Sequence, residues 1–110
     1  MTAWTVSFLD EALDDLKNLD GSTRALVLKA IKKVQINPLP TERRGYGKPL
    51  GNRLSSHLTG LMKIKLRGVG IRVVYKIEEQ GGIMLVVIIG MRSDSEVYRE
   101  AQRRREKHGI

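Results

Sequence analysis

The stretch KIKLRGVGIRVVYKI, residues 63–77, decides the fold. Two apolar runs rich in β-branched residues flank the short GVG segment, and this arrangement is typical of a β-hairpin. The same fifteen residues carry five cations and no acid. Because side chains alternate along a strand, Lys63, Lys65 and Arg67 are expected on one face, while the apolar residues between them point into the core. Arg72 is expected beside them on the neighbouring strand.

Like charges held so close together oppose folding, and a sequence selected for stability alone would intersperse acids among them. The hairpin therefore indicates an anionic ligand. Phosphodiesters fit, because guanidinium groups grip phosphate oxygens in pairs. Crowded positive charge also lowers the pKa of a lysine, which would suit it for general-base chemistry. A cationic face that binds phosphate without any chemistry is the alternative, and spacing alone does not separate the two.

The charge of the whole chain is unevenly distributed. Its 110 residues carry a net charge of +8, yet residues 1–20 hold five acids and one lysine, so the remainder carries +12. From Arg43 to Lys76 there are nine Lys or Arg residues and no acid. Such a field attracts a polyanion. A solvated surface that merely aids solubility is the alternative.

Composition limits the compartment and the class of protein. Cysteine is absent, which excludes disulfides and thiolate metal sites. The N-terminus MTAWTVSFLDEALDD lacks a basic leader and turns acidic early, and the longest apolar run is too short to cross a bilayer. We therefore expect a cytoplasmic protein, formed by a single domain over residues 1–110.

The remaining pattern predicts an α+β fold with a mainly antiparallel sheet. A first strand is expected within residues 3–9, and a helix with an acidic outer face over 9–19. Ser22 is a candidate cap for a second helix that Pro38 stops, and a polar loop covers 41–51. Three further strands are expected near 59–67, 70–78 and 83–90, followed by a C-terminal helix capped by one of Ser93, Asp94 or Ser95.

Familiar catalytic motifs are missing. The two histidines, His57 and His108, are far apart, and the second is expected in a frayed tail. No metal-binding, phosphate-loop or serine-hydrolase motif appears. The acids Asp10, Glu11, Asp14 and Asp15 are best interpreted as the solvated start of a helix.

In this order and spacing, MKIKLRGVGIRVVYKI and IIGMRSDSEVYREAQRR resemble the RelE toxins of the RelE/ParE superfamily over residues 3–105. The resemblance implies a RelE-like fold and a metal-independent endoribonuclease that cuts mRNA in the ribosomal A site through attack by the RNA's own 2′-hydroxyl. It also implies a cognate RelB-like antitoxin in an inhibitory complex, with a heterotetramer among the expected forms.

The resemblance implies a catalytic set as well. Lys65 would be the general base, with Lys63 and Arg72 stabilising the phosphorane. Arg92 would protonate the leaving oxygen or assist it electrostatically, and the very high pKa of a guanidinium favours the second role. Tyr98 would stack on a base. The expected RNA and ribosome contacts are Arg43, Arg44, Lys48, Arg53 and Arg67.

Three positions, Met62, Met91 and Ile71, depart from the family pattern in ways that could alter codon preference or rate. Two other functions compete with RNA cleavage. One is a gyrase inhibitor like the ParE branch, which usually lacks this lysine and arginine set. The other is a nucleic-acid-binding module that cuts nothing.

Overall fold

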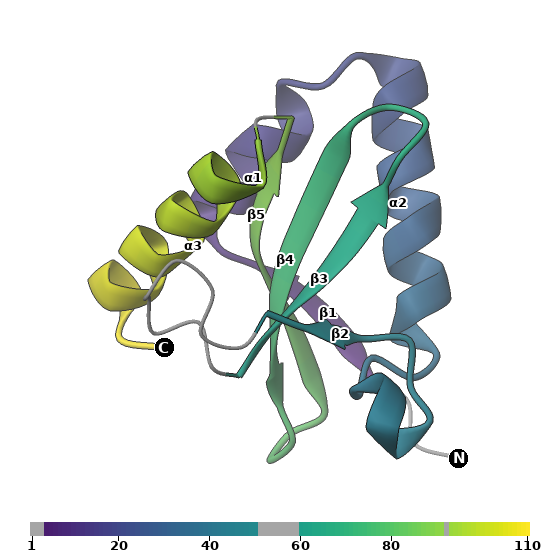
Figure 1. The fold of residues 1–110 in the computed structure, drawn as a ribbon, viewed down its shortest axis with the longest axis vertical. Coiled ribbons are helices and arrows are strands. Elements are labelled where there is room, and N and C mark those ends of the chain that lie inside the picture. Colours follow the sequence, from purple (N-terminus) through teal and green to yellow (C-terminus); the bar gives the residue numbers. More distant parts are fainter. Residues whose placement is uncertain (1–3, 51–59, 92) are drawn as a thin grey trace.

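The computed structural model describes residues 4–50, 60–91 and 93–110, and it has the predicted α+β architecture (Figure 1). The sheet order is β1-β5-β4-β3-β2. β1 runs parallel to β5, and the other neighbouring strands are antiparallel. The elements are β1 (Thr5–Phe8), α1 (Asp10–Lys17), α2 (Gly21–Gln35), the 3-10 turn η1 (Thr41–Arg43), β2 (Lys48–Pro49), β3 (Leu61–Leu66), β4 (Ile71–Glu78), β5 (Ile83–Gly90) and α3 (Asp94–His108).

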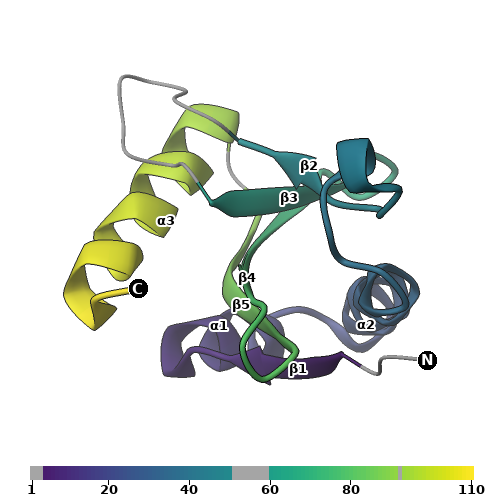
Figure 2. The same ribbon diagram turned by 90° about the horizontal axis from the view of Figure 1, so that it is seen from below.

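The two faces of the sheet are covered differently. α1 and α2 lie on one side and α3 on the other, as Figures 1 and 2 show together. The α1/α2 side buries a large apolar cluster that includes Val27, Val73 and Val86. The α3 side buries a smaller one that includes Leu61, Val87 and Tyr98. No helix within the described ranges is both long and apolar enough to span a membrane.

β5 contributes to both cores because it lies inside the sheet with both of its faces covered, and it also contains a β-bulge. Tyr75 pairs with Val86 and Val74 with Ile88, so Val87 is an extra residue on β5. A bulge shifts the side-chain alternation by one position. Met84 and Val86 accordingly face the α1/α2 core, whereas Val87 and Ile88 face α3. The uninterrupted apolar run of this strand follows from this double role.

The helix caps differ from the sequence prediction at one place. Asp20, not Ser22, caps α2, and its Oδ1 accepts a hydrogen bond from the backbone N–H of Thr23 at 2.8 Å. The Ser22 hydroxyl instead donates to the Asp20 carboxylate. α3 begins after Ser93, as expected, and the Ser93 hydroxyl accepts from the backbone of Glu96.

A loop was predicted at 41–51, and its described part, residues 41–50, is more ordered than expected. It contains η1 and the short strand β2, which pairs with the outer edge of β3. The polar composition of this stretch hid both elements. Gly47 lies so close to the sheet that an added Cβ would sit 2.5 Å from the hydroxyl of Tyr75.

Candidate phosphate-binding site

The β3–β4 hairpin gathers three of the predicted catalytic residues on one face. Lys63 and Lys65 are two positions apart on β3, so they share a side of the sheet. Lys65 pairs directly with Arg72 of β4. Directly opposed side chains point to the same face. Leu61, two positions before Lys63, packs in the α3-side core, which identifies this face as the one that α3 covers.

α3 covers only part of this face, and Lys65 and Arg72 occupy the part it leaves open. Lys63 lies near the border and is 9% exposed, whereas Lys65 is exposed and Arg72 is half-buried. The register partner of Arg72 on β5 is Gly90. A Cβ added to Gly90 would sit 2.9 Å from the side chain of Val97, so the first turns of α3 pass directly over this glycine. The cationic positions therefore lie beside the N-terminal part of α3.

A hollow of about 310 Å³ opens at the end of the hairpin. Lys65, Arg67 and Arg72 contribute to its lining. Arg72 Nη1 donates to the carbonyl of Gly70 at 3.1 Å, so its guanidinium is turned toward the hairpin loop. Three cationic side chains around one hollow form a suitable environment for a phosphate oxygen.

Tyr98 is not placed for the role expected of it. Its side chain is 1% exposed and packs among the apolar residues of the α3-side core. An amphipathic helix buries one stripe, and Tyr98 falls on the same stripe as Val97 and Ala101. With the ring inside the core, stacking on a base would require α3 to move.

The other predicted contacts are dispersed. Arg43 pairs with Glu79, so its charge is partly neutralised by an acid just beyond the acid-free run. Arg44 ends η1 in a left-handed conformation and is exposed. Lys48 lies on β2 and Arg67 in the hairpin turn, both exposed. Arg53 and Arg92 lie outside the described residues.

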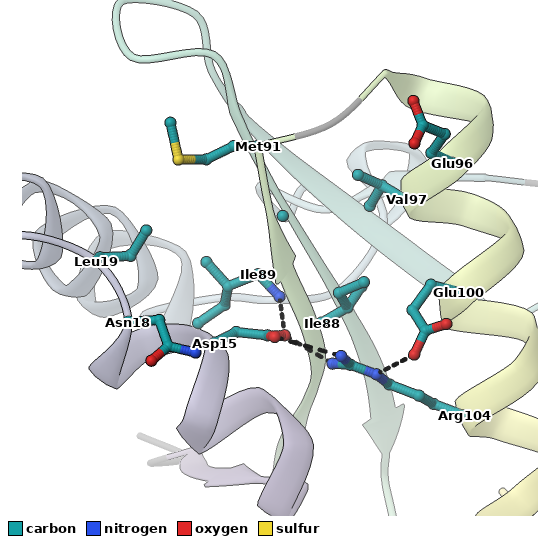
Figure 3. Close-up of a pocket in the computed structure, with 11 residues that line it drawn as sticks. Asp15, Asn18, Leu19, Ile88, Ile89, Met91, Glu96, Val97, Glu100 and Arg104 are labelled. Carbon is teal, nitrogen blue, oxygen red and sulfur yellow. Dashed lines mark hydrogen bonds and ion pairs between the residues drawn. The ribbon is translucent and has the colours of Figure 1, made fainter.

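Sequence reasoning missed an ion-pair network between α1, β5 and α3 (Figure 3). The buried guanidinium of Arg104 donates to Asp15 at 2.6 Å, to Glu100 at 2.9 Å and to the Val87 carbonyl at 3.0 Å. Asp15 also accepts from the backbone N–H of Ile89. β1 ends at Phe8, opposite Val86, so these two side chains satisfy the edge of β5 where its neighbour has stopped.

The acids of α1 are therefore not simply solvated. Glu11 contacts Lys107 at 3.0 Å and His108 at 2.9 Å, and the hydrogen bond from His108 is the main reason that the pKa of Glu11 falls to about 2. A hydrogen bond from Arg103, aided by Arg104, lowers the pKa of Glu100 to about 2. His108, expected in a frayed tail, ends α3 in contact with α1. The only feature of the sequence that could have indicated these ion pairs was the opposite charge of α1 and α3.

A second cavity, of about 480 Å³, lies beside this network. Figure 3 shows Asp15 and Leu19 on one wall, Glu96 and Glu100 on the other, and Ile88 and Ile89 between them. Its three acids would repel phosphate, and Arg104 is already paired with two of them. The hairpin hollow, and not this cavity, is therefore the candidate phosphate site. Within the described ranges, no group of three or more His, Asp or Glu side chains is arranged to hold a metal ion.

Comparisons with known proteins identify the class of protein to which this chain belongs. The model of the family described as ParE toxin of the type II toxin-antitoxin system matches residues 6–96. The mRNA interferase toxin RelE of Escherichia coli K12 is 29% identical over 102 residues, covering 93% of this chain and 97% of its own.

Solved structures agree. A free-state mutant of E. coli toxin RelE has a TM-score of 0.73 at 28% identity, with 94% of this chain and 98% of that chain covered. E. coli RelE in complex with an antitoxin RelBc peptide has a TM-score of 0.64 at 28% identity, with 91% and 95% covered.

A basic α+β domain of this topology, with cations on the open part of its sheet, is thus of the type II toxin class. The chain belongs to the RelE/ParE superfamily as a RelE-family toxin, which confirms the resemblance.

Proposed function

We propose that this toxin is a ribosome-dependent endoribonuclease that cuts mRNA in the ribosomal A site. The observation that carries the proposal is the convergence of Lys63, Lys65 and Arg72 on one face, next to a hollow. The relative named an mRNA interferase, which aligns over nearly the whole chain, supports the same activity.

The proposed chemistry uses the RNA, these side chains and a proton from solvent. The 2′-oxygen attacks the adjacent phosphorus while Lys65 accepts the hydroxyl proton as general base. The bond from phosphorus to the 5′-oxygen breaks, and that oxygen takes a proton from solvent. The products are a 2′,3′-cyclic phosphate and a 5′-hydroxyl. Lys65 suits the base role because it is the exposed lysine of the two on β3.

Lys63 and Arg72 supply fixed positive charge. Extra negative charge develops on the phosphorus oxygens as the 2′-oxygen adds, and preorganised cations stabilise it more than the ground state. Lys63 is held near the edge of the α3-side core, so little reorganisation accompanies its action. Arg92 is proposed, on the resemblance alone, to stabilise charge on the leaving oxygen. Together these side chains play the part that a metal ion plays in other nucleases.

The proposed ribosome dependence is supported by the geometry that cleavage requires. Cleavage requires the 2′-oxygen, the phosphorus and the leaving oxygen in line. The ring expected to orient the base, Tyr98, packs in the core. We propose that the decoding site holds the codon in the reactive geometry, and that the exposed cations Arg44 and Arg67 contact RNA there. Arg43, which is paired with Glu79, and Arg53 are proposed as weaker contributors.

The partner we propose is a RelB-like antitoxin, with both proteins in the cytoplasm where ribosomes are found. Its inhibitory segment would be acidic, because it must cover a face where Lys63, Lys65 and Arg72 crowd together. A RelE of E. coli is seen with an antitoxin peptide, which supports a partner of this kind.

The deciding experiment adds purified protein to stalled ribosomes carrying a defined mRNA and maps the new 5′ ends. We expect a break within the A-site codon, with no cleavage of free RNA. Arg72→Ala should remove the break while its circular dichroism and thermal midpoint stay unchanged.

A ParE-like activity is the second candidate, because the matching family model is that of ParE toxins. This alternative predicts inhibition of gyrase supercoiling with the message left whole. A supercoiling assay on the same protein preparation separates the two functions.

A further inference from the structure

β2 carries a cation whose position the sequence did not reveal. Lys48 was expected in a loop that meets ribosomal RNA. In the structure it is the direct register partner of Lys63, across the β2–β3 pair. Opposed residues of antiparallel strands have Cβ atoms only about 5 Å apart and on the same face. Lys48 therefore belongs to the same face as Lys63, Lys65 and Arg72.

The face on which Lys48 lies is fixed by its neighbour Leu50. The Leu50 backbone N–H donates to the Leu61 carbonyl at 3.0 Å, which continues the β2–β3 pairing. Its side chain is 2% exposed and packs in the α3-side core with Leu61 and Tyr98. Residues two apart on a strand share a face, so burial of Leu50 holds Lys48 on the α3 side.

The segment that leads into β2 is tied to the sheet. The Tyr75 hydroxyl, from β4, donates to the Pro38 carbonyl at 2.7 Å, and burial of this phenol raises its pKa. The Gly47 N–H donates to the Leu39 carbonyl, and the Gly47 carbonyl accepts from Thr41. These bonds position Lys48 by a folded scaffold and not by a free loop.

The charge of Lys48 is directed to solvent. The residue is exposed, and no ion pair joins it to any acid in the part of the chain that the structure describes. Arg43, in the same segment, is by contrast paired with Glu79. Lys48 lies next to Lys63 and Lys65 of β3, and its counter-charge is left to a ligand.

We propose that Lys48 is a substrate-positioning residue that binds the mRNA phosphate next to the scissile one. This inference rests on the proposed RNA cleavage. Cations on β3 recur about every 6.6 Å, and Lys48 extends this set sideways by one strand. The scissile phosphate lies against Lys65 and Arg72 with Lys63 beside them, and the neighbouring phosphate then reaches Lys48, one strand further along.

The test measures single-turnover cleavage on programmed ribosomes for wild type, Lys48→Ala and Lys29→Ala. Lys29 is an exposed lysine of α2, on the other side of the sheet, so its replacement removes the same charge away from the site. We expect Lys48→Ala to lower kcat/KM about tenfold and to reduce the salt dependence by about one phosphate contact. Lys29→Ala should change neither.

A second arm removes the charge from the RNA. A message with a neutral methylphosphonate at the linkage next to the cleaved one should be cut about equally by wild type and Lys48→Ala, because the partner of Lys48 is gone. A full tenfold difference on this message overturns the proposal. So does a Lys48→Ala variant that cleaves like Lys29→Ala, or one that loses affinity for ribosomes without mRNA by the same factor, which would indicate a ribosomal RNA contact.

Failure of the proposed function has a different signature. If the wild-type protein leaves every message whole, RNA cleavage is wrong and the role of Lys48 is wrong with it. If the wild type cleaves and only the Lys48 effects are missing, RNA cleavage stands and the role of Lys48 is wrong.

Discussion

The two faces of one sheet have been put to different uses. Toward α1 and α2 the face is apolar along its length, from Met84 on β5 to Met62 on β3. Toward α3 it is apolar where the helix packs on it, and the same strands also carry Lys63, Lys65 and Arg72 on this face. In the proposed function, the part of this face that α3 leaves uncovered is the part that meets RNA.

The largest effect is expected when a cation is removed from the open part of the face. Lys65→Ala should lower ribosome-dependent cleavage by about 10²- to 10⁴-fold, the usual contribution of a general base. The measurement is single-turnover cleavage with mapped 5′ ends. Lys32→Ala, an exposed lysine of α2, is the matched control and should cleave normally. Cleavage by Lys65→Ala at the wild-type rate would contradict the assignment.

A substitution at Tyr98 tests the packing of the part of the sheet that α3 covers. Replacing it with Ala leaves a cavity in a core in which the ring is fully buried, and the free energy of unfolding should fall by about 3–5 kcal/mol. Denaturant unfolding measures this.

Tyr98→Leu separates packing from base stacking. Leucine fills much of the space but has no ring, so stability should be largely kept. If Tyr98 acts by packing, this variant cleaves near the wild-type rate. A folded Tyr98→Leu protein that no longer cleaves would restore the stacking role.

The attachment of α3 can be broken at Asp15. Asp15→Ala leaves the buried guanidinium of Arg104 with Glu100 as its remaining acidic contact. Loss of one partner of a buried pair costs about 3 kcal/mol. The thermal midpoint should fall, whereas Asp14→Ala, at an exposed position of the same helix, should leave it unchanged.

The smallest expected effect is a pH dependence from Glu100. Its pKa is lowered to about 2 in the folded protein, from 4.5, so the stabilisation it gives is complete above about pH 4.5. It is lost as the pH falls toward 2. Glu100→Gln should flatten the loss of stability in that window, as followed by urea unfolding at successive pH values. An unchanged slope would mean that other carboxylates dominate acid unfolding.

Sequence alone predicted what depends on short-range pattern. The β3–β4–β5 meander follows from the turns at GVG and EEQGG, and α1 follows from its leucine spacing. β2 escaped prediction because two residues, one of them Pro49, carry no periodicity. The parallel pairing of β1 with β5 joins segments nearly eighty residues apart and has no local signal.

In the candidate site, too, the sequence predicted the short-range features and missed the long-range ones. Strand alternation placed Lys63, Lys65 and Arg72 together, since their pairing spans a short turn. The burial of Tyr98 depends on which stripe of α3 meets the sheet. The position of Lys48 depends on a strand that is too short to be recognised in the sequence. The Asp15–Arg104 pair joins residues 89 positions apart, so opposite charge alone did not identify the partners.

The hydrogen bonds that Asp15 and Arg104 make to β5, near the bulge at Val87, bear on the register of this strand. A strand that is apolar at every position has no pattern by which its side chains can reject a shift of one residue. The Asp15 carboxylate and the Arg104 guanidinium bind the backbone of Ile89 and Val87, not their side chains. A slipped strand would present the wrong backbone groups to both. Two charged residues on flanking helices thereby disfavour a one-residue shift of this strand.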